Sequence, residues 1–196
     1  MEFCTVQFFR TKLNKHAILQ TMINYFIIPG LGGSGPEHWQ TYFEKLGDNF
    51  HRIKQKDWDA PNIHEWAANI DRAIADYDPE NVVLVAHSLG CPTLAYWANL
   101  YQRKIKGALL VAPPDIDQVH LKLNKTLFDT FPANKIKFET IVVASTNDQW
   151  ATLNKAKSYA DNWGSKFVNI GDAGHINDQS GFGDWKQGQD ILKRLA

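Results

Sequence analysis

Short apolar runs and segments of helical periodicity alternate along most of the chain. Runs of branched apolar residues bounded by turn residues are typical of strands buried in a parallel sheet. Such runs occupy residues 23–28, 50–55, 82–85, 107–112, 138–144 and 166–170, and the run 50–55 is the most polar of them. Segments with apolar residues at helical spacing occupy residues 38–46, 62–77, 89–99, 123–131, 151–163 and 184–195. This alternation predicts a single α/β domain with a largely parallel sheet of about six strands, right-handed crossovers and helices on both faces.

Residues 1–21 do not share this pattern. Their apolar positions, followed by a basic segment, have neither the period of a strand nor that of a helix. We predict an N-terminal extension over residues 1–21, as an edge strand or a cover for the core, and a domain over residues 22–196. Basic residues before the apolar stretch 17–28 resemble a secretory signal, but polar residues interrupt the stretch and no small-x-small cleavage site closes it. Because its second half is also needed as a strand, we predict a cytoplasmic protein.

The composition limits the partners. The 21 basic and 21 acidic residues give a formal net charge of +0, so no field attracts nucleic acid or an anionic membrane. No run approaches the roughly 20 apolar residues of a membrane helix. The two cysteines, Cys4 and Cys91, do not suggest a disulfide framework, and the 7 histidines show no metal-ligand spacing. We expect a small-molecule ligand, with no cofactor and no metal ion.

A serine lies where the strand 82–85 passes into a helix. Ser88 stands between Ala86 and Gly90 in the segment Ala-His-Ser-Leu-Gly-Cys. The sharp strand-to-helix turn of the α/β-hydrolases, the nucleophile elbow, has the pattern G-x-S-x-G, because only small residues fit around its serine. Here Ala86 replaces the first glycine. In such a turn the Leu89 backbone N–H faces the developing oxyanion, whereas an ordinary serine at this position only caps the helix.

The glycine-rich loop after the strand 23–28 allows two interpretations. Gly30, Gly32 and Gly35 satisfy the G-x-G-x-x-G dinucleotide motif, and an acid, Asp57 or Asp59, follows about twenty residues on. In a hydrolase, the same loop presents the Leu31 backbone N–H as the second oxyanion donor. A hydrolase also needs an acid and a histidine at strand ends, which a dinucleotide site does not.

Both residues are present in the expected places. Asp148 follows the strand 138–144, and His175 follows the last strand. Loops after parallel strands open at the same edge of the sheet, so Ser88, Asp148 and His175 are expected to lie together. Their order along the chain, Ser, Asp, His, is that of the α/β-hydrolases. In this hypothesis His175 takes the proton of Ser88, and Asp148 orients the imidazole and stabilises the imidazolium.

Other acids and histidines lie near these positions. Four acids follow strands or lie near the predicted base in sequence, and we rank them below Asp148: Asp115, Asp117, Asp172 and Asp178. We expect His87, beside the serine, to order the neighbouring loop. We expect His38 to pack on its helix.

Several motifs together carry a family resemblance. They are residues 29–40, the elbow 86–91, the acid segment 147–148, and residues 163–165, 174–177 and 180–185. These segments resemble the small serine hydrolases of the YdeN and retinoblastoma-binding protein 9 type, over residues 22–196. The resemblance implies a compact α/β-hydrolase without a large cap domain, the triad Ser88, Asp148 and His175, and a carboxylic ester or similar acyl compound as substrate. Ala86 and residues 1–21 depart from the family pattern.

The connection 113–137 limits the size of the site. Its length of about 25 residues leaves room for one short helix over 123–131 but not for a lid domain. Three tryptophans near the rim are candidates for the walls of a shallow aromatic site: Trp58, Trp150 and Trp185. Such a site favours short acyl groups.

These features predict a serine hydrolase that cleaves small esters through an acyl-enzyme on Ser88. Two alternatives stay open. One is an NAD(P)-binding oxidoreductase that uses the loop of Gly30, Gly32 and Gly35. The other is a hydrolase-like fold that serves as a protein-binding module. Covalent labelling by a fluorophosphonate probe separates the hydrolase from both.

Overall fold

The computed structural model describes residues 22–196. The predicted extension over residues 1–21 lies outside the described residues.

Six strands form one sheet in the order β2-β1-β3-β4-β5-β6, and every neighbouring pair is parallel. The strands are β1 (Asn24–Ile28), β2 (Phe50–Arg52), β3 (Val82–His87), β4 (Gly107–Val111), β5 (Glu139–Ala144) and β6 (Lys166–Asn169). The strand expected over 50–55 shortens to 3 residues, because only its first half pairs with β1. The prediction of a parallel sheet of six strands is confirmed.

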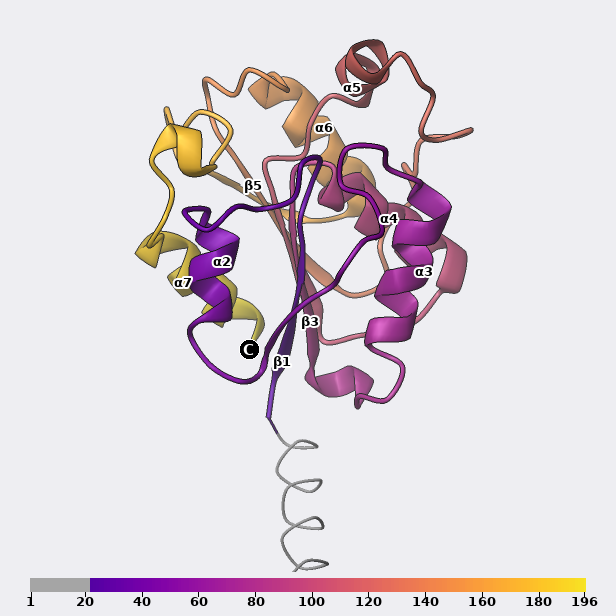
Figure 1. Cartoon of the computed structure of the whole chain (residues 1–196), viewed down its shortest axis with the longest axis vertical. Helices are drawn as coiled ribbons and strands as arrows, with labels where there is room; N and C mark the ends of the chain where they lie inside the picture. Colours follow the sequence, from indigo (N-terminus) through magenta and orange to yellow (C-terminus); the bar gives the residue numbers. More distant parts are fainter. Residues whose placement is uncertain (1–21) are drawn as a thin grey trace, which may run out of the picture.

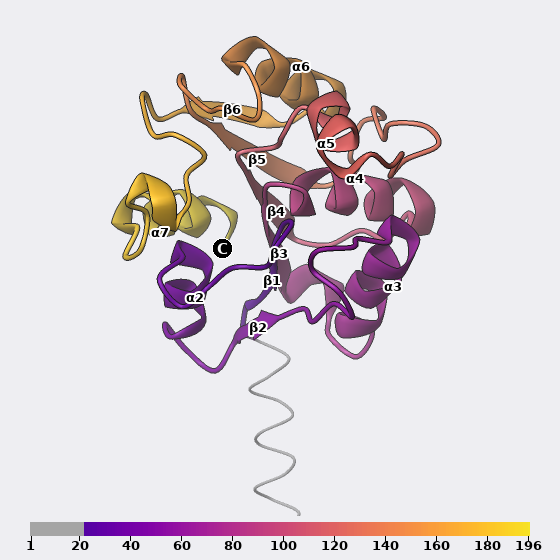
Figure 2. The same ribbon diagram turned by 45° about the horizontal axis from the view of Figure 1, so that its top comes forward.

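Helices cover both faces of this sheet (Figures 1 and 2). They are α2 (Trp39–Glu44), α3 (Ile63–Ala73), α4 (Gly90–Tyr101), α5 (Ile116–Leu123), α6 (Leu153–Trp163) and α7 (Lys186–Leu192). Short 3-10 helices are η1 (Pro79–Asn81), η2 (Asp178–Ser180) and η3 (Lys193–Leu195). Residues of α3, α4 and α6 pack in one apolar cluster, and residues of α2 and α7 pack in another on the opposite face.

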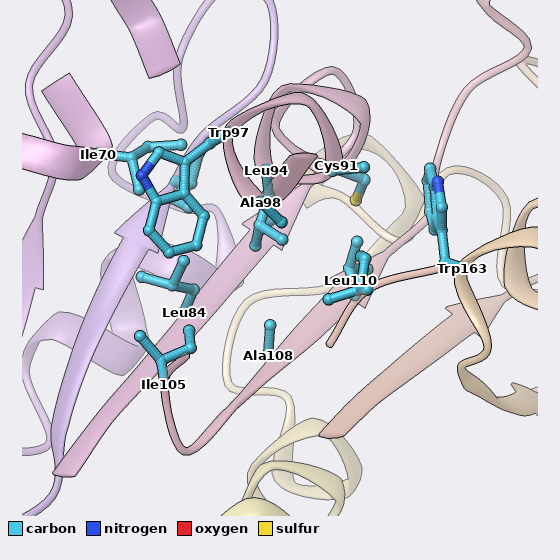
Figure 3. Packing of buried hydrophobic residues seen from close by; sticks show 14 of the residues in the cluster. Ile70, Leu84, Cys91, Leu94, Trp97, Ala98, Ile105, Ala108, Leu110 and Trp163 are labelled. Atoms are coloured by element: carbon cyan, nitrogen blue, oxygen red, sulfur yellow. The ribbon is translucent and has the colours of Figure 1, made fainter. Parts of the chain in front are cut away.

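The side chains of β3 alternate between these two clusters. Leu84 and Ala86 belong to the cluster under α3, α4 and α6, whereas Val83 and Val85 belong to the cluster under α2 and α7. All four residues are fully buried, which explains the unbroken apolar sequence of this strand. Figure 3 shows Trp97 pointing from α4 toward the strand that carries Leu84. The strand that leads into Ser88 is therefore held from both sides.

The helix predicted over 123–131 is wrong. In the structure α5 comes earlier, because Asp115 caps its start by accepting the Asp117 N–H at 3.2 Å. Asn124 ends the helix in the left-handed region, at φ 47°. Leu127 and Phe128 are buried but lie in neither a helix nor a strand. Their apolar spacing reflects the burial of a loop, and no cap domain occupies this interval.

Candidate active site

Ser88 lies on a tight turn between β3 and α4. Its φ of 51° is in the left-handed region, which is uncommon for a residue with a side chain. The turn is fixed by two backbone hydrogen bonds: the Ser88 N–H donates to the Val111 carbonyl, and the Cys91 N–H donates to the Ser88 carbonyl, both at 2.9 Å. This geometry raises the serine hydroxyl above the carboxyl edge of the sheet, as an elbow requires.

Two glycines allow the elbow and the loop after β1 to touch. A Cβ atom on Gly30 would lie 2.7 Å from the Ser88 Cβ, and a Cβ atom on Gly90 would lie 2.5 Å from the Ile28 carbonyl oxygen. Neither position tolerates a side chain without movement of the backbone. This contact explains why position 30 is a glycine without requiring a dinucleotide site. It also brings Leu31 next to the serine.

Leu31 and Leu89 line the cavity in front of Ser88. Within residues 22–196, neither of their backbone N–H groups donates a hydrogen bond to the protein. Neighbouring donors are engaged: the Gly32 N–H, for example, donates to the Trp58 carbonyl at 2.9 Å. Both N–H groups predicted as oxyanion donors are therefore available to an acceptor in the cavity.

The structure brings Ser88, His175 and Asp148 into one hydrogen-bonded row. The His175 Nε2 lies 2.9 Å from the Ser88 Oγ. The His175 Nδ1 lies 2.8 Å from one Asp148 oxygen and 3.0 Å from the other. Since the carboxylate can only accept, Nδ1 carries the proton and Nε2 is left to accept from the serine. The side chains of His175 and Asp148 are 6% and 4% exposed, so bulk water does not compete for these bonds.

A small polar network joins the acid loop to the histidine loop. Ser145 accepts the Ala173 N–H at 2.9 Å, and Asn147 accepts the Gly174 N–H at 2.7 Å. The Ser145 hydroxyl also donates to the Asn147 side chain at 2.9 Å. Sequence reasoning missed this network, whose only signal was two small polar residues beside the predicted acid. It fixes the distance between the loops that carry Asp148 and His175.

The backbone of the loop that carries His175 is also held by side chains of β3 and α2. The His87 Nε2–H donates to the His175 carbonyl at 3.0 Å, and the Trp39 indole N–H donates to the Ile176 carbonyl at 2.9 Å. The expectation that His87 orders a neighbouring loop is confirmed by this bond. Because His87 is buried, its pKa lies well below the usual histidine value, and nearby His38 lowers it further.

His38 does more than pack on its helix. Its Nδ1 caps α2 by accepting the Gln40 N–H at 3.2 Å, and its ring lies 4.7 Å from the ring of His87. Its Nε2 has no hydrogen-bond partner in the described part of the chain. Burial lowers the pKa of His38 to about 4, although the Asp178 carboxylate opposes this shift. His38 is thus a neutral imidazole at the wall of the cavity.

The four lower-ranked acids do not replace Asp148. Asp115 and Asp117 pair with Lys155, at 3.0 Å and 3.5 Å. Asp172 is exposed. Asp178 is exposed as well and lines the mouth of the cavity. The two hydrogen bonds to the His175 Nδ1 come from Asp148.

The cavity beside Ser88 has a volume of about 420 Å³. Of the three tryptophans predicted as its walls, Trp150 lines it, with its ring 6.1 Å from the ring of His175. Trp58 is not a wall residue, because its ring packs behind Gly33, where a Cβ would lie at 3.4 Å, and against Trp66. Trp185 is not a wall residue either, because it is 5% exposed and packs in the apolar cluster under α2 and α7. Its ring centroid lies 5.2 Å from that of Trp39.

Residues 22–196 contain no group of three or more His, Cys, Asp and Glu side chains arranged to hold a metal ion. None of the helices in that range is long and apolar enough to cross a membrane. Cys91 is a buried free thiol, and burial raises its pKa well above the usual value. Cys4 lies outside the described residues.

Several known proteins are similar to this chain in sequence or in fold. YdeN of Bacillus subtilis (strain 168), named as a hydrolase, is 24% identical over 168 residues, which are 80% of this chain and 87% of that protein. A YdeN-like hydrolase from Pectobacterium atrosepticum is 29% identical, with a TM-score of 0.79 over 91% of this chain and 93% of that one. The crystal structure of the Bacillus subtilis ydeN product superposes with a TM-score of 0.73 at 22% identity, over 89% and 98% of the two chains.

These similarities extend over nearly the whole described domain. The predicted α/β-hydrolase fold is confirmed by the six parallel strands and by the fold shared with the YdeN-like structures. The family model described as serine hydrolase matches residues 25–194. The chain therefore belongs to the serine hydrolase family, with an α/β-hydrolase fold.

Proposed function

We propose that this hydrolase cleaves small carboxylic esters, with Ser88 as nucleophile, His175 as general base and Asp148 as the acid that orients it. The observation that carries the proposal is the continuous row of hydrogen bonds from the Ser88 Oγ through the imidazole to the Asp148 carboxylate. A serine hydroxyl is a weak nucleophile at its own pKa, and a base within hydrogen-bond reach is what activates it.

In the first half of the reaction, the Ser88 oxygen attacks the ester carbonyl carbon as its proton passes to the His175 Nε2. The carbonyl oxygen becomes an oxyanion, which accepts hydrogen bonds from the Leu31 and Leu89 N–H groups. The C–O bond to the alcohol then breaks, and His175 gives its proton to the leaving oxygen. Asp148 stabilises the transient imidazolium. The products of this half are the alcohol and an acyl ester on Ser88.

In the second half, water attacks the acyl ester and gives a proton to His175. The C–O bond to Ser88 breaks, the serine recovers its proton from His175, and the carboxylic acid leaves. Each oxyanion donor of this kind is worth about 10² to 10³ in rate, because its dipole is already aimed at the developing charge. The N–H groups of Leu31 and Leu89, which donate to no acceptor among residues 22–196, support such a role.

The size of the cavity supports a small substrate. A volume of about 420 Å³ lies in the lower part of the range for small-molecule sites. The connection between β4 and β5 holds only the short helix α5. We infer that short acyl chains fill this space best.

The test is covalent labelling by a fluorophosphonate probe, together with hydrolysis of p-nitrophenyl acetate. We expect the wild-type chain to react and Ser88→Ala to lose both labelling and about 10⁴ to 10⁶ in rate, with a melting temperature close to that of wild type. Ser158→Ala, which removes an exposed hydroxyl on α6, is the matched control and should keep full activity. Labelling that survives in Ser88→Ala would exclude Ser88 as nucleophile. A wild-type chain that takes no probe would favour a binding module instead.

A further inference from the structure

A lysine ammonium group lies at the wall of the cavity. Lys122, in the last turn of α5, lines the cavity together with Ser88. Its Nζ lies 4.2 Å from the ring centroid of Trp150, which also lines the cavity. A cation over an indole face is attracted by the negative face of the ring, so this contact favours one position of a flexible side chain.

In the described part of the chain, the charge on Lys122 has no counterion. Within residues 22–196, no ion pair or side-chain hydrogen bond includes its Nζ. Two acids near Lys122 in sequence, at the start of α5, are already paired: Asp115 and Asp117 both form ion pairs with Lys155 of α6. The positive charge at this wall is therefore free to pair with a group that enters the cavity.

Trp150 gives this wall a fixed position relative to the reacting atoms. Its backbone N–H donates to the Asp148 Oδ1, and its carbonyl accepts the N–H of Asp115 at the start of α5, both at 2.8 Å. The same segment thus connects the acid beside His175 to the helix that carries Lys122. Two groups of one substrate, one at Ser88 and one at Lys122, would therefore be held at a fixed separation.

The other charged residue of the lining comes from a different element. Asp178, in η2, also lines the cavity, and its negative charge partly opposes the lowering of the His38 pKa by burial. A negative substrate group is repelled there and attracted at α5. Building on the proposed function, we propose that Lys122 and Trp150 form a subsite for a carboxylate that the ester carries away from its scissile bond. The preferred substrates are then esters with a second, anionic end, such as monoesters of short dicarboxylic acids.

The experiment compares matched pairs of esters in which a neutral primary amide replaces the carboxylate, so that each compound has one ester bond. In one pair the carboxylate is on the acyl side: monomethyl glutarate against its primary amide. In the other it is on the alcohol side: 4-acetoxybutanoate against its primary amide. We expect the wild-type chain to prefer the anionic member of one pair in kcat/KM, and the pair that shows the preference identifies the side of the ester that faces Lys122. The Lys122 side chain is exposed, so Lys122→Met should reduce that preference about threefold, the effect of losing a solvent-exposed ion pair, while the neutral ester changes less than twofold.

Two controls make the result specific. Lys157→Met removes a positive charge on the outer surface of α6, where it pairs with Asp161, and should leave the preference unchanged. Lys122→Glu should lower kcat/KM for the anionic ester further than Lys122→Met does. The same ratio of anionic to neutral ester in the wild type and in Lys122→Met, for both pairs, would overturn the subsite while leaving the proposed function intact.

A binding measurement keeps the subsite testable if no ester is hydrolysed. Calorimetric titration of the Ser88→Ala chain with monomethyl glutarate should show binding that weakens about threefold in the Ser88→Ala, Lys122→Met double variant. The binding should also weaken with added salt, because an exposed ion pair is screened. Equal affinity of the two chains for this monoester, and for 4-acetoxybutanoate, would overturn the subsite by itself.

Discussion

The buried histidine at the start of α2 makes the stability of the fold sensitive to acid. His38 is 3% exposed, and burial lowers its pKa to about 4, whereas an unfolded chain has a histidine pKa near 6.5. Because the folded pKa is the lower one, the unfolded chain binds more protons as the pH falls below about 6.5. Stability is therefore fully present above that pH and is lost on acidification through the interval down to about pH 4.

The size of the effect follows from the two pKa values. Integrating the difference in bound protons gives a loss of about 2 kcal/mol by pH 5 and about 3 kcal/mol by pH 4 from this one residue. The matched variant is His38→Asn, because asparagine is a good N-cap residue and its side-chain oxygen can accept the Gln40 N–H in place of Nδ1. It removes the titrating group and keeps the cap.

The assay is urea unfolding of both chains at pH 7.5 and at pH 5. The lost ring packing lowers the stability of His38→Asn at both pH values, so it cancels in the difference, and so does the titration of groups that lie away from His38. We expect the wild-type chain to lose about 2 kcal/mol more between the two pH values than the variant loses. Equal losses in the two chains would refute the argument that His38 is held neutral by burial.

Three further predictions concern the catalytic geometry. Asp148→Asn should lower kcat for ester hydrolysis by about 10⁴, since His175 loses the acceptor that sets its tautomer. In the same assay Asp172→Asn should stay near wild type. If Asp172→Asn lowered kcat and Asp148→Asn did not, the acid would be Asp172. Gly30→Ala places a Cβ 2.7 Å from that of Ser88. The resulting displacement of the serine or of the loop after β1 should lower kcat/KM by about 10². Full activity would show that the loop moves without disturbing Ser88. On p-nitrophenyl esters the rate should peak at acetate or butyrate and fall about tenfold or more toward long chains, so a profile rising to dodecanoate would contradict the small site.

The positions of the three candidate catalytic side chains could be predicted because they depend on topology. In a parallel sheet every loop after a strand opens at the same edge, so the strand ends alone place Ser88, Asp148 and His175 on one rim. The structure has this topology and the contacts between the three side chains. Apolar runs as clear as that of β3 leave little choice of element.

The walls of the cavity could not be predicted in the same way. Trp58, Trp150 and Trp185 all follow strands or loops near the rim, but a sequence does not say toward which side of a loop an indole points. Trp185 packs under the sheet and Trp58 lies behind the glycine loop. The helix of the 113–137 connection was misplaced for a related reason, since buried loop residues such as Leu127 and Phe128 imitate a helical face. Such positions are decided by long-range packing.

The elbow shows why the alanine at position 86 is compatible with the pattern of small residues around the serine. Ala86 pairs in register with Ile28 of β1, and its side chain is fully buried in the apolar cluster beneath α4. The space that must stay empty lies elsewhere, at Gly90, where a Cβ would meet the Ile28 carbonyl at 2.5 Å, and at Gly30, where it would meet Ser88. A methyl group at position 86 fills the core rather than the gap between the elbow and the loop after β1. The requirement for glycine thus follows from the distance to neighbouring backbone, and this chain keeps glycine at both positions where that distance demands it.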